Sequence, residues 1–70
     1  MNEKRTLFET KAAEWTGHVV RIYVVNGFQV RGELIASDAW SVLIRDDKQN
    51  QEMLINRENI TTMESLYSKK

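Results

Sequence analysis

The sequence predicts a mainly β fold, in which an N-terminal α-helix is followed by a five-stranded, strongly bent antiparallel small barrel. Residues 3–16 contain no Gly or Pro and carry apolar side chains at helical spacing. From Val19 onward the apolar residues alternate along the chain, which is the period of a strand. Turn residues then recur roughly every eight to twelve positions, as in small all-β barrels.

The helix is expected over about residues 3–16. Gly17 follows at the position where helices commonly end in a left-handed residue, and His18 comes next. We interpret His18 as a polar residue at this junction and not as a ligand. The helix carries one amphipathic stripe, formed by Leu7, Phe8, Lys11, Ala12 and Trp15.

The first two strands are expected to form a hairpin. β-Branched residues dominate residues 19–25, and Asn26-Gly27 favours a two-residue type I′ turn, whose central residues both need positive φ. Gly32, in the middle of the second strand, indicates a sharp bend or a close approach of another backbone. With this turn we expect one face to carry Tyr23, Val25, Gln29 and Arg31. The opposite face of the second strand is expected to carry Phe28, Val30, Gly32, Leu34 and Ala36.

Three further strands complete the predicted barrel. They are expected over residues 40–45, 52–56 and 60–63. Asp38 precedes the first of them and is expected to cap its own turn rather than to act in catalysis. The sequence thus predicts one domain over residues 1–63, with the barrel over about 19–63 and a short C-terminal tail over 64–70. The architecture is that of a small SH3-like or OB-like barrel.

The composition excludes several classes of protein. The 70 residues carry 10 Lys and Arg against 10 Asp and Glu, no Cys and one His. A disulfide framework, a thiolate metal site and a cysteine nucleophile are therefore excluded, and we expect no cofactor, no metal and no catalytic residue. No apolar run is long enough to cross a membrane, and the N-terminus is polar, so we expect an unprocessed cytoplasmic protein. Because a domain of this size has a marginal core, self-association is expected to add stability.

One block of the sequence resembles the first Sm motif of the Hfq family of bacterial RNA chaperones. The block runs from Ile22 to Leu34, and Asp38 and the aromatic Trp40 follow it. Residues 54–62 occupy the place of the second Sm motif, which has diverged. The similarity extends from about residue 7 to residue 63. Its most specific part is similar to the Gram-positive members and reads Asn26-Gly27-Phe28-Gln29-Val30-Arg31-Gly32.

The resemblance implies a homohexameric ring with two RNA-binding faces. The fourth strand of one subunit would pair with the fifth strand of the next, which protects the exposed sheet edges. The distal face, opposite the helix, would take adenine-rich single-stranded RNA, with Tyr23 stacking on a base and Gln29 and Arg31 donating hydrogen bonds. Met53 stands where the family has an adenine-reading glutamine. The residues assigned to this face, called the distal set below, are Tyr23, Asn26, Gly27, Phe28, Gln29, Val30, Arg31 and Thr62.

The proximal face of such a ring would take uridine-rich RNA around the pore, and its residues depart further from the family. We call Trp40, Arg57 and Glu58 the proximal set. Trp40 takes the position of the aromatic residue that stacks on uracil, although an indole there could also belong to the rim or the core. Arg57 keeps a positive charge. Glu58 replaces a histidine and Ala39 a glutamine, so the resemblance implies weaker or altered uridine-rich binding.

Two functions are compatible with these features. One is an RNA chaperone ring that binds small RNAs and messenger RNAs in post-transcriptional regulation, where repeated weak contacts add up without any chemistry. The other is a small-barrel oligomer that scaffolds proteins with reduced RNA binding, which the zero net charge and the divergent second motif favour. The sequence holds no nucleophile–base pair and no phosphate-cradling glycine loop that would indicate an enzyme.

Overall fold

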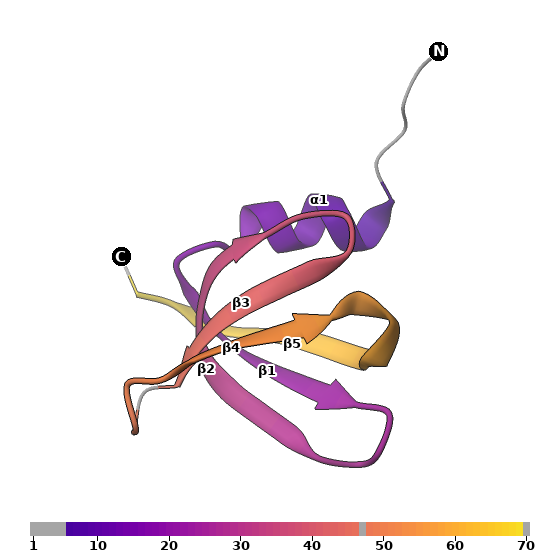
Figure 1. Cartoon of the computed structure of the whole chain (residues 1–70). Coiled ribbons are helices and arrows are strands. Elements are labelled where there is room, and N and C mark those ends of the chain that lie inside the picture. The colour runs from indigo at the N-terminus through magenta and orange to yellow at the C-terminus, as the bar shows by residue number, and fades with distance from the viewer. Residues whose placement is uncertain (1–5, 47, 70) are drawn as a thin grey trace.

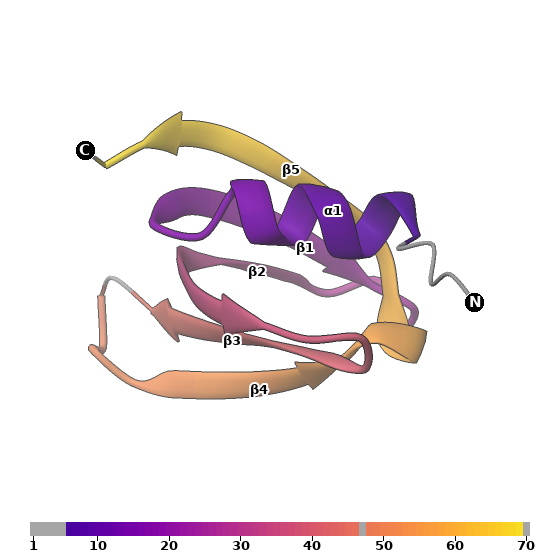
Figure 2. The ribbon, with the colours of Figure 1, turned by 90° about the horizontal axis from the view of Figure 1, so that it is seen from above.

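A short helix and five antiparallel strands make up the part of the chain that the computed structural model describes, residues 6–46 and 48–69. The elements are α1 (Leu7–Glu14), β1 (His18–Val24), β2 (Gln29–Ser37), β3 (Ser41–Asp46), β4 (Glu52–Asn56), the 3₁₀ turn η1 (Arg57–Asn59) and β5 (Ile60–Ser68). The strand order is β4-β3-β2-β1-β5. Figures 1 and 2 show α1 at one side of the bent strands, with the chain running from it directly into β1.

The predicted mainly β architecture is therefore confirmed. The strands bend strongly, yet the barrel stays open, because β4 and β5 are the two edges of the sheet and do not pair with each other in the described chain. Each edge strand exposes a row of backbone hydrogen-bonding groups on its outer side. Two such edges leave the subunit with unsatisfied pairing capacity on opposite sides of the sheet.

Helix α1 begins at a well-formed cap. Thr6 is the N-cap, since its Oγ1 accepts the backbone N–H of Glu9 (3.1 Å) while Glu9 Oε1 accepts the backbone N–H of Thr6 (3.0 Å). The helix ends at Glu14, and Gly17 then takes a φ of +92°, a conformation that L-residues rarely adopt. The predicted helix over about 3–16 is thus too long at its C-terminal end, and its residues 3–5 lie outside the described part.

The core is built from alternate residues of the three central strands and from one side of the helix. Its fully buried cluster is Ala12, Val20, Ile22, Leu34, Val42 and Ile44, and Val19 of β1 is fully buried as well. Ala12 is the buried residue of α1 and joins the helix to the sheet. Burying an aliphatic side chain stabilises a fold by about 1.5–3 kcal/mol, so this stripe fixes which face of each strand points inward.

Gly32 allows β2 and β3 to approach each other closely, as the sequence predicts. A Cβ at this position would clash with the backbone carbonyl oxygen of Arg45 on β3. Any larger residue would therefore have to push the two strands apart at a point where they are hydrogen-bonded.

The alternation of β2 breaks at Ile35. Leu34 lies opposite Ile44, but the next paired residue is Ala36, which lies opposite Leu43. One extra residue on β2 forms a bulge and reverses the order of inward and outward side chains. Ala36 is exposed in consequence. The predicted placement of Ala36 on the same face as Leu34 is wrong.

Strand β5 continues well past its predicted end. The sequence predicts a tail over residues 64–70, whereas β5 pairs with β1 as far as Ser68, which lies opposite His18. β5 pairs along the edge of β1 that β2 leaves uncovered, from Val24 to His18. A side-chain contact supports this pairing, because His18 Nδ1 lies 2.8 Å from Ser65 Oγ. Two register shifts interrupt the alternation of polar and apolar residues in β5, so the sequence pattern does not predict a strand there. The prediction of a tail is wrong for residues 64–68, and residue 70 lies outside the described part.

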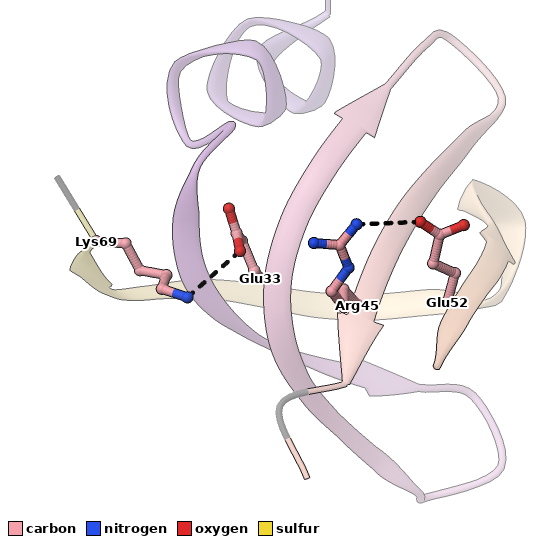
Figure 3. A network of polar contacts seen from close by, with 4 residues as sticks. All are labelled: Glu33, Arg45, Glu52 and Lys69. Carbon is pink, nitrogen blue, oxygen red and sulfur yellow. Dashed lines mark hydrogen bonds and ion pairs between the residues drawn. The ribbon is translucent and has the colours of Figure 1, made fainter. Parts of the chain in front are cut away.

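A row of charged side chains crosses the sheet, and Figure 3 shows its four members. Lys69 Nζ lies 3.4 Å from Glu33 Oε1, and Arg45 Nη2 lies 3.3 Å from Glu52 Oε2. Glu33 is directly opposite Arg45, so the signs alternate along the whole row. We call this row the charge ladder. Exposed pairs of this kind contribute little singly, but opposite charges on facing strands favour the observed register.

Candidate functional site

The hairpin between β1 and β2 decides which residues of the distal set share a face. The Val24 N–H donates to the Phe28 carbonyl (3.0 Å) and the Gly27 N–H donates to the Val24 carbonyl (2.9 Å). The loop therefore has three residues, 25–27, and of these Gly27 takes a positive φ of +93° while Asn26 does not. The predicted two-residue type I′ turn is wrong.

The three-residue loop is what aligns Tyr23 with Gln29. These two residues are direct partners in the pairing of β1 with β2, whereas a two-residue loop would place each odd-numbered residue of β1 opposite an even-numbered one of β2. Residues that lie directly opposite each other project to the same face. The predicted common face of Tyr23, Gln29 and Arg31 is thus confirmed, but the three-residue loop produces it, and the predicted two-residue turn would have separated Tyr23 from Gln29. Val25 lies in the loop and not in the strand.

A polar row with an aromatic centre crosses three strands at this place. Thr62 of β5 lies opposite Tyr23 of β1, which lies opposite Gln29 of β2. Thr62 and Gln29 are exposed and Tyr23 is half-buried. A tyrosine ring between a hydroxyl and an amide can stack on a planar base and leaves donors and acceptors on both sides of it.

The remaining members of the distal set take other positions. Asn26 Oδ1 accepts the backbone N–H of Phe28 (3.3 Å), so this side chain supports the loop. Phe28 is 67% exposed at the end of the hairpin. Val30 lies opposite the buried Ile22 and packs against the core. The structure thus brings Val30 to the inward face, away from Tyr23 and Gln29.

The proximal set is brought together in one cavity. Trp40, Arg57 and Glu58 line a space of about 530 Å³, together with Glu9, Ala39 and Asn56. Trp40 is 76% exposed, so it is not a core residue. Trp40 lies just before β3 and contributes an exposed indole to the lining of the cavity. An exposed indole of this kind can stack on a base, but two carboxylates share the same cavity.

Arg57 is held by groups that sequence reasoning missed. Its guanidinium lies over the ring of Phe8, 4.9 Å from the ring centroid, and its Nη1 donates to the carbonyl oxygen of Ala39 (3.3 Å). Its backbone N–H donates to the carbonyl oxygen of Trp40 (2.8 Å). Phe8 is far from Arg57 in sequence, and its helical stripe indicated only core packing, so no local signal identifies this contact.

Asp38 shapes the turn that presents Trp40. Its Oδ1 accepts the backbone N–H groups of Trp40 and Ser41, each at 2.8 Å. The hydrogen bonds from Trp40 and then Ser41 hold the pKa of the Asp38 carboxyl below its ordinary value. The predicted role of Asp38 as a turn cap is confirmed.

Metal ligands do not gather in the described residues, where no group of three or more His, Asp or Glu side chains could hold an ion. Within residues 6–46 and 48–69, no helix is long and apolar enough to cross a membrane. The candidate sites are the surfaces built by the distal and proximal sets, because both combine an aromatic ring with hydrogen-bonding groups.

Comparison with known proteins identifies the relatives of this chain. The family model described as Hfq protein matches residues 11–69. A 1.55 Å crystal structure of the pleiotropic translational regulator Hfq has a similar fold, with a TM-score of 0.76, 21% sequence identity, and coverage of 84% of this chain and 98% of that one. A comparison with curated proteins found no match. The resemblance to the Hfq family is thereby confirmed, and the chain belongs to that family.

Proposed function

We propose that the protein is an RNA chaperone that forms a homohexameric ring and captures adenine-rich single-stranded RNA on its distal face. The observation that carries this proposal is the row formed by Thr62, Tyr23 and Gln29 on one exposed face of the sheet. Membership of the Hfq family supports RNA binding as the general function. Small RNAs and messenger RNAs in the cytoplasm are the proposed targets, in post-transcriptional regulation.

The energetics of the row favour a repeated, single-stranded ligand. Stacking of one base on an aromatic ring contributes about 1–3 kcal/mol, which is weak for a single site. A ring that repeats Tyr23 and Gln29 around its axis converts these contacts into one attachment, because each later contact is intramolecular. The mechanism requires no enzymatic step.

The open sheet supports ring assembly. Strands β4 and β5 are both edges, so β4 of one subunit can pair with β5 of the next around a closed ring. Leu54 of β4 is 70% exposed and offers an apolar side chain to such a contact. Asn56 stands where the family has a tyrosine, which removes an aromatic contact from β4 and is expected to weaken the ring.

Uridine-rich RNA is expected to bind the proximal set more weakly. Glu9 and Glu58 bring two carboxylates to the cavity that contains Trp40. The guanidinium of Arg57 contacts the ring of Phe8 and the carbonyl oxygen of Ala39, so fewer of its N–H groups are free to donate to a phosphate. A phosphate backbone in this cavity would therefore meet more repulsion than attraction.

Fluorescence anisotropy with labelled adenine-rich and uridine-rich oligoribonucleotides tests the proposal. We expect tight binding of the adenine-rich strand, and we expect Tyr23→Ala to weaken it about tenfold or more while the oligomer stays intact. Tyr67→Ala is the matched control, because Tyr67 is 50% exposed near the other end of β5. Light scattering after size-exclusion chromatography reports the ring.

Two results would overturn the proposal. Unchanged binding by Tyr23→Ala would remove the assignment of adenine-rich RNA to this row. Failure of the unmodified protein to bind either strand, together with purification free of nucleic acid, would favour the alternative of a small-barrel scaffold for proteins, which the zero net charge also favours.

A further inference from the structure

Two arginines lie directly opposite each other beside the Tyr23 row. Arg21 of β1 and Arg31 of β2 are partners in the sheet, and Arg21 is also opposite Glu64 of β5. Like charges in this arrangement destabilise a sheet. A sheet keeps such a pair at a cost to its own stability, which suggests that the pair acts on a ligand outside the sheet.

One carboxylate, that of Glu64, lies in the row with the two arginines and pairs with Arg21 alone. Arg21 Nη1 lies 3.5 Å from Glu64 Oε1, at the long end of an ion pair, and both side chains are partly exposed, at 34% and 44%. Arg31 is exposed and makes no ion pair within residues 6–46 and 48–69. The row Glu64–Arg21–Arg31 therefore carries one net positive charge.

The charge ladder provides the contrast within the same sheet. There Arg45 lies between Glu33 and Glu52 in the strand pairing, and every cation faces a carboxylate, as Figure 3 shows. Ordinary register preferences are sufficient to explain an alternating row. They do not explain the adjacent cations Arg21 and Arg31.

The paired arginines lie close to the proposed stacking position. Arg21 is two residues from Tyr23 along β1 and projects to the same face, at a distance of about 7 Å along the strand. A base stacked on Tyr23 has its own phosphodiester within reach of side chains at that distance. Guanidinium groups bind phosphate oxygens through planar, paired hydrogen bonds.

We propose that Arg21 and Arg31 form a subsite for the phosphodiester backbone of single-stranded RNA, and that Glu64 limits its strength by competing for Arg21. The inference rests on the proposed function, because it places the phosphate of a nucleotide whose base lies on Tyr23. The subsite supplies affinity without base specificity, whereas the Thr62–Tyr23–Gln29 row contacts the base.

The first test removes the cation. Arg21→Gln should weaken binding of an adenine-rich strand about tenfold and should make the salt dependence shallower, by about 0.7 in log–log slope for each phosphate that the protein no longer neutralises. Arg45→Gln is the matched control, since it also removes one exposed arginine from the sheet but leaves the row Glu64–Arg21–Arg31 unchanged. Circular dichroism and size-exclusion chromatography check that both variants fold and assemble.

The second test removes the competing carboxylate. Glu64→Gln frees Arg21 and should tighten binding about two- to fivefold. Glu52→Gln is the control, because it removes a carboxylate that is ion-paired with arginine at a similar distance elsewhere in the sheet and changes the net charge equally. Equal effects of Glu64→Gln and Glu52→Gln would reduce the inference to a general effect of net charge and overturn it.

The outcomes separate this inference from the proposed function. If the adenine-rich strand binds and depends on Tyr23, while Arg21→Gln and Glu64→Gln leave affinity and salt slope unchanged, the phosphate subsite is wrong and the proposed function stands. If the adenine-rich strand does not bind the unmodified protein, the proposed function fails, and the subsite fails with it.

Discussion

The guanidinium of Arg57 lies over the ring of Phe8, 4.9 Å from the ring centroid, and so joins η1 to helix α1. The same side chain donates to the carbonyl oxygen of Ala39 (3.3 Å). These contacts hold the helix, the turn before β3 and η1 around the cavity that Trp40 lines. Arg57, the positively charged residue of the proximal set, therefore stabilises the structure around the cavity.

The contact between Phe8 and Arg57 can be measured by a double-mutant cycle. Phe8→Leu keeps an apolar side chain and removes the ring, and Arg57→Gln removes the charge. We expect a coupling free energy of about 0.5–1 kcal/mol in urea unfolding. All four proteins must be compared at one concentration, because the stability of an oligomer depends on it. A coupling near zero would mean that the two groups are neighbours without attraction.

Gly32→Ala should disrupt the sheet at its bend. The added methyl group meets the backbone carbonyl of Arg45, which cannot rotate away as a side chain could. We expect a decrease of about 3 kcal/mol in the free energy of unfolding, at the upper end of overpacking effects. Ser37→Ala, at the end of the same strand, is the control and should change stability little. A Gly32→Ala protein as stable as the unmodified one would contradict the close approach of β2 and β3.

Removing the second half of β5 should destabilise the fold. A chain that ends at Met63 lacks the strand pairing of residues 64–68 and the hydrogen bond between His18 and Ser65. We expect a clear drop in the thermal unfolding midpoint, because the outer edge of β1 is then uncovered. A chain that ends at Ser68 keeps the pairing and serves as the control. Equal midpoints for the two truncated chains would show that residues 64–68 add no stability.

Glu58→Gln should strengthen binding of uridine-rich RNA. The change removes one of the carboxylates that line the cavity of Trp40 and keeps the size of the side chain. We expect affinity for a uridine-rich strand to rise about two- to fivefold, with a smaller change for an adenine-rich strand. Glu14→Gln, on the exposed side of α1 in an ion pair with Lys11, is the control for net charge. An equal gain from both variants would remove the special role of Glu58.

The fold was predictable because its main signals are local. The change from helical to alternating periodicity at Val19, the turn at Asp38 and the mid-strand Gly32 each depend on nearby residues. The Asn26-Gly27 pair also marked the hairpin correctly but gave the wrong turn type, because the register of β1 on β2 is set over the whole strand by burial of Ile22 and its neighbours.

The errors concern features that depend on distant partners. Residues 64–68 become a strand only because β1 has a free edge, which no local pattern records. The bulge at Ile35 turns Ala36 outward, and this bulge depends on how β2 pairs with β3, which is also distant in the sequence. In the candidate site, the motif identified Tyr23 and Gln29, whereas the contact of Arg57 with Phe8 and the opposition of Arg21 to Arg31 need the three-dimensional register.

The turn at Asp38 gives a prediction about pH. The backbone N–H groups of Trp40 and Ser41 hold the pKa of the Asp38 carboxyl below its ordinary value of 3.8. A carboxyl whose pKa is lower in the folded than in the unfolded protein contributes stability above the unfolded pKa and loses it as the pH falls through the folded one.

Asp38→Asn lacks this titration. The stability advantage of the unmodified protein should therefore stay constant above about pH 5 and shrink as the pH falls below 3.8. Urea unfolding of both proteins across this range measures the difference, and an NMR titration of the Asp38 carboxyl with a midpoint at or above 3.8 would contradict the assigned role of the turn.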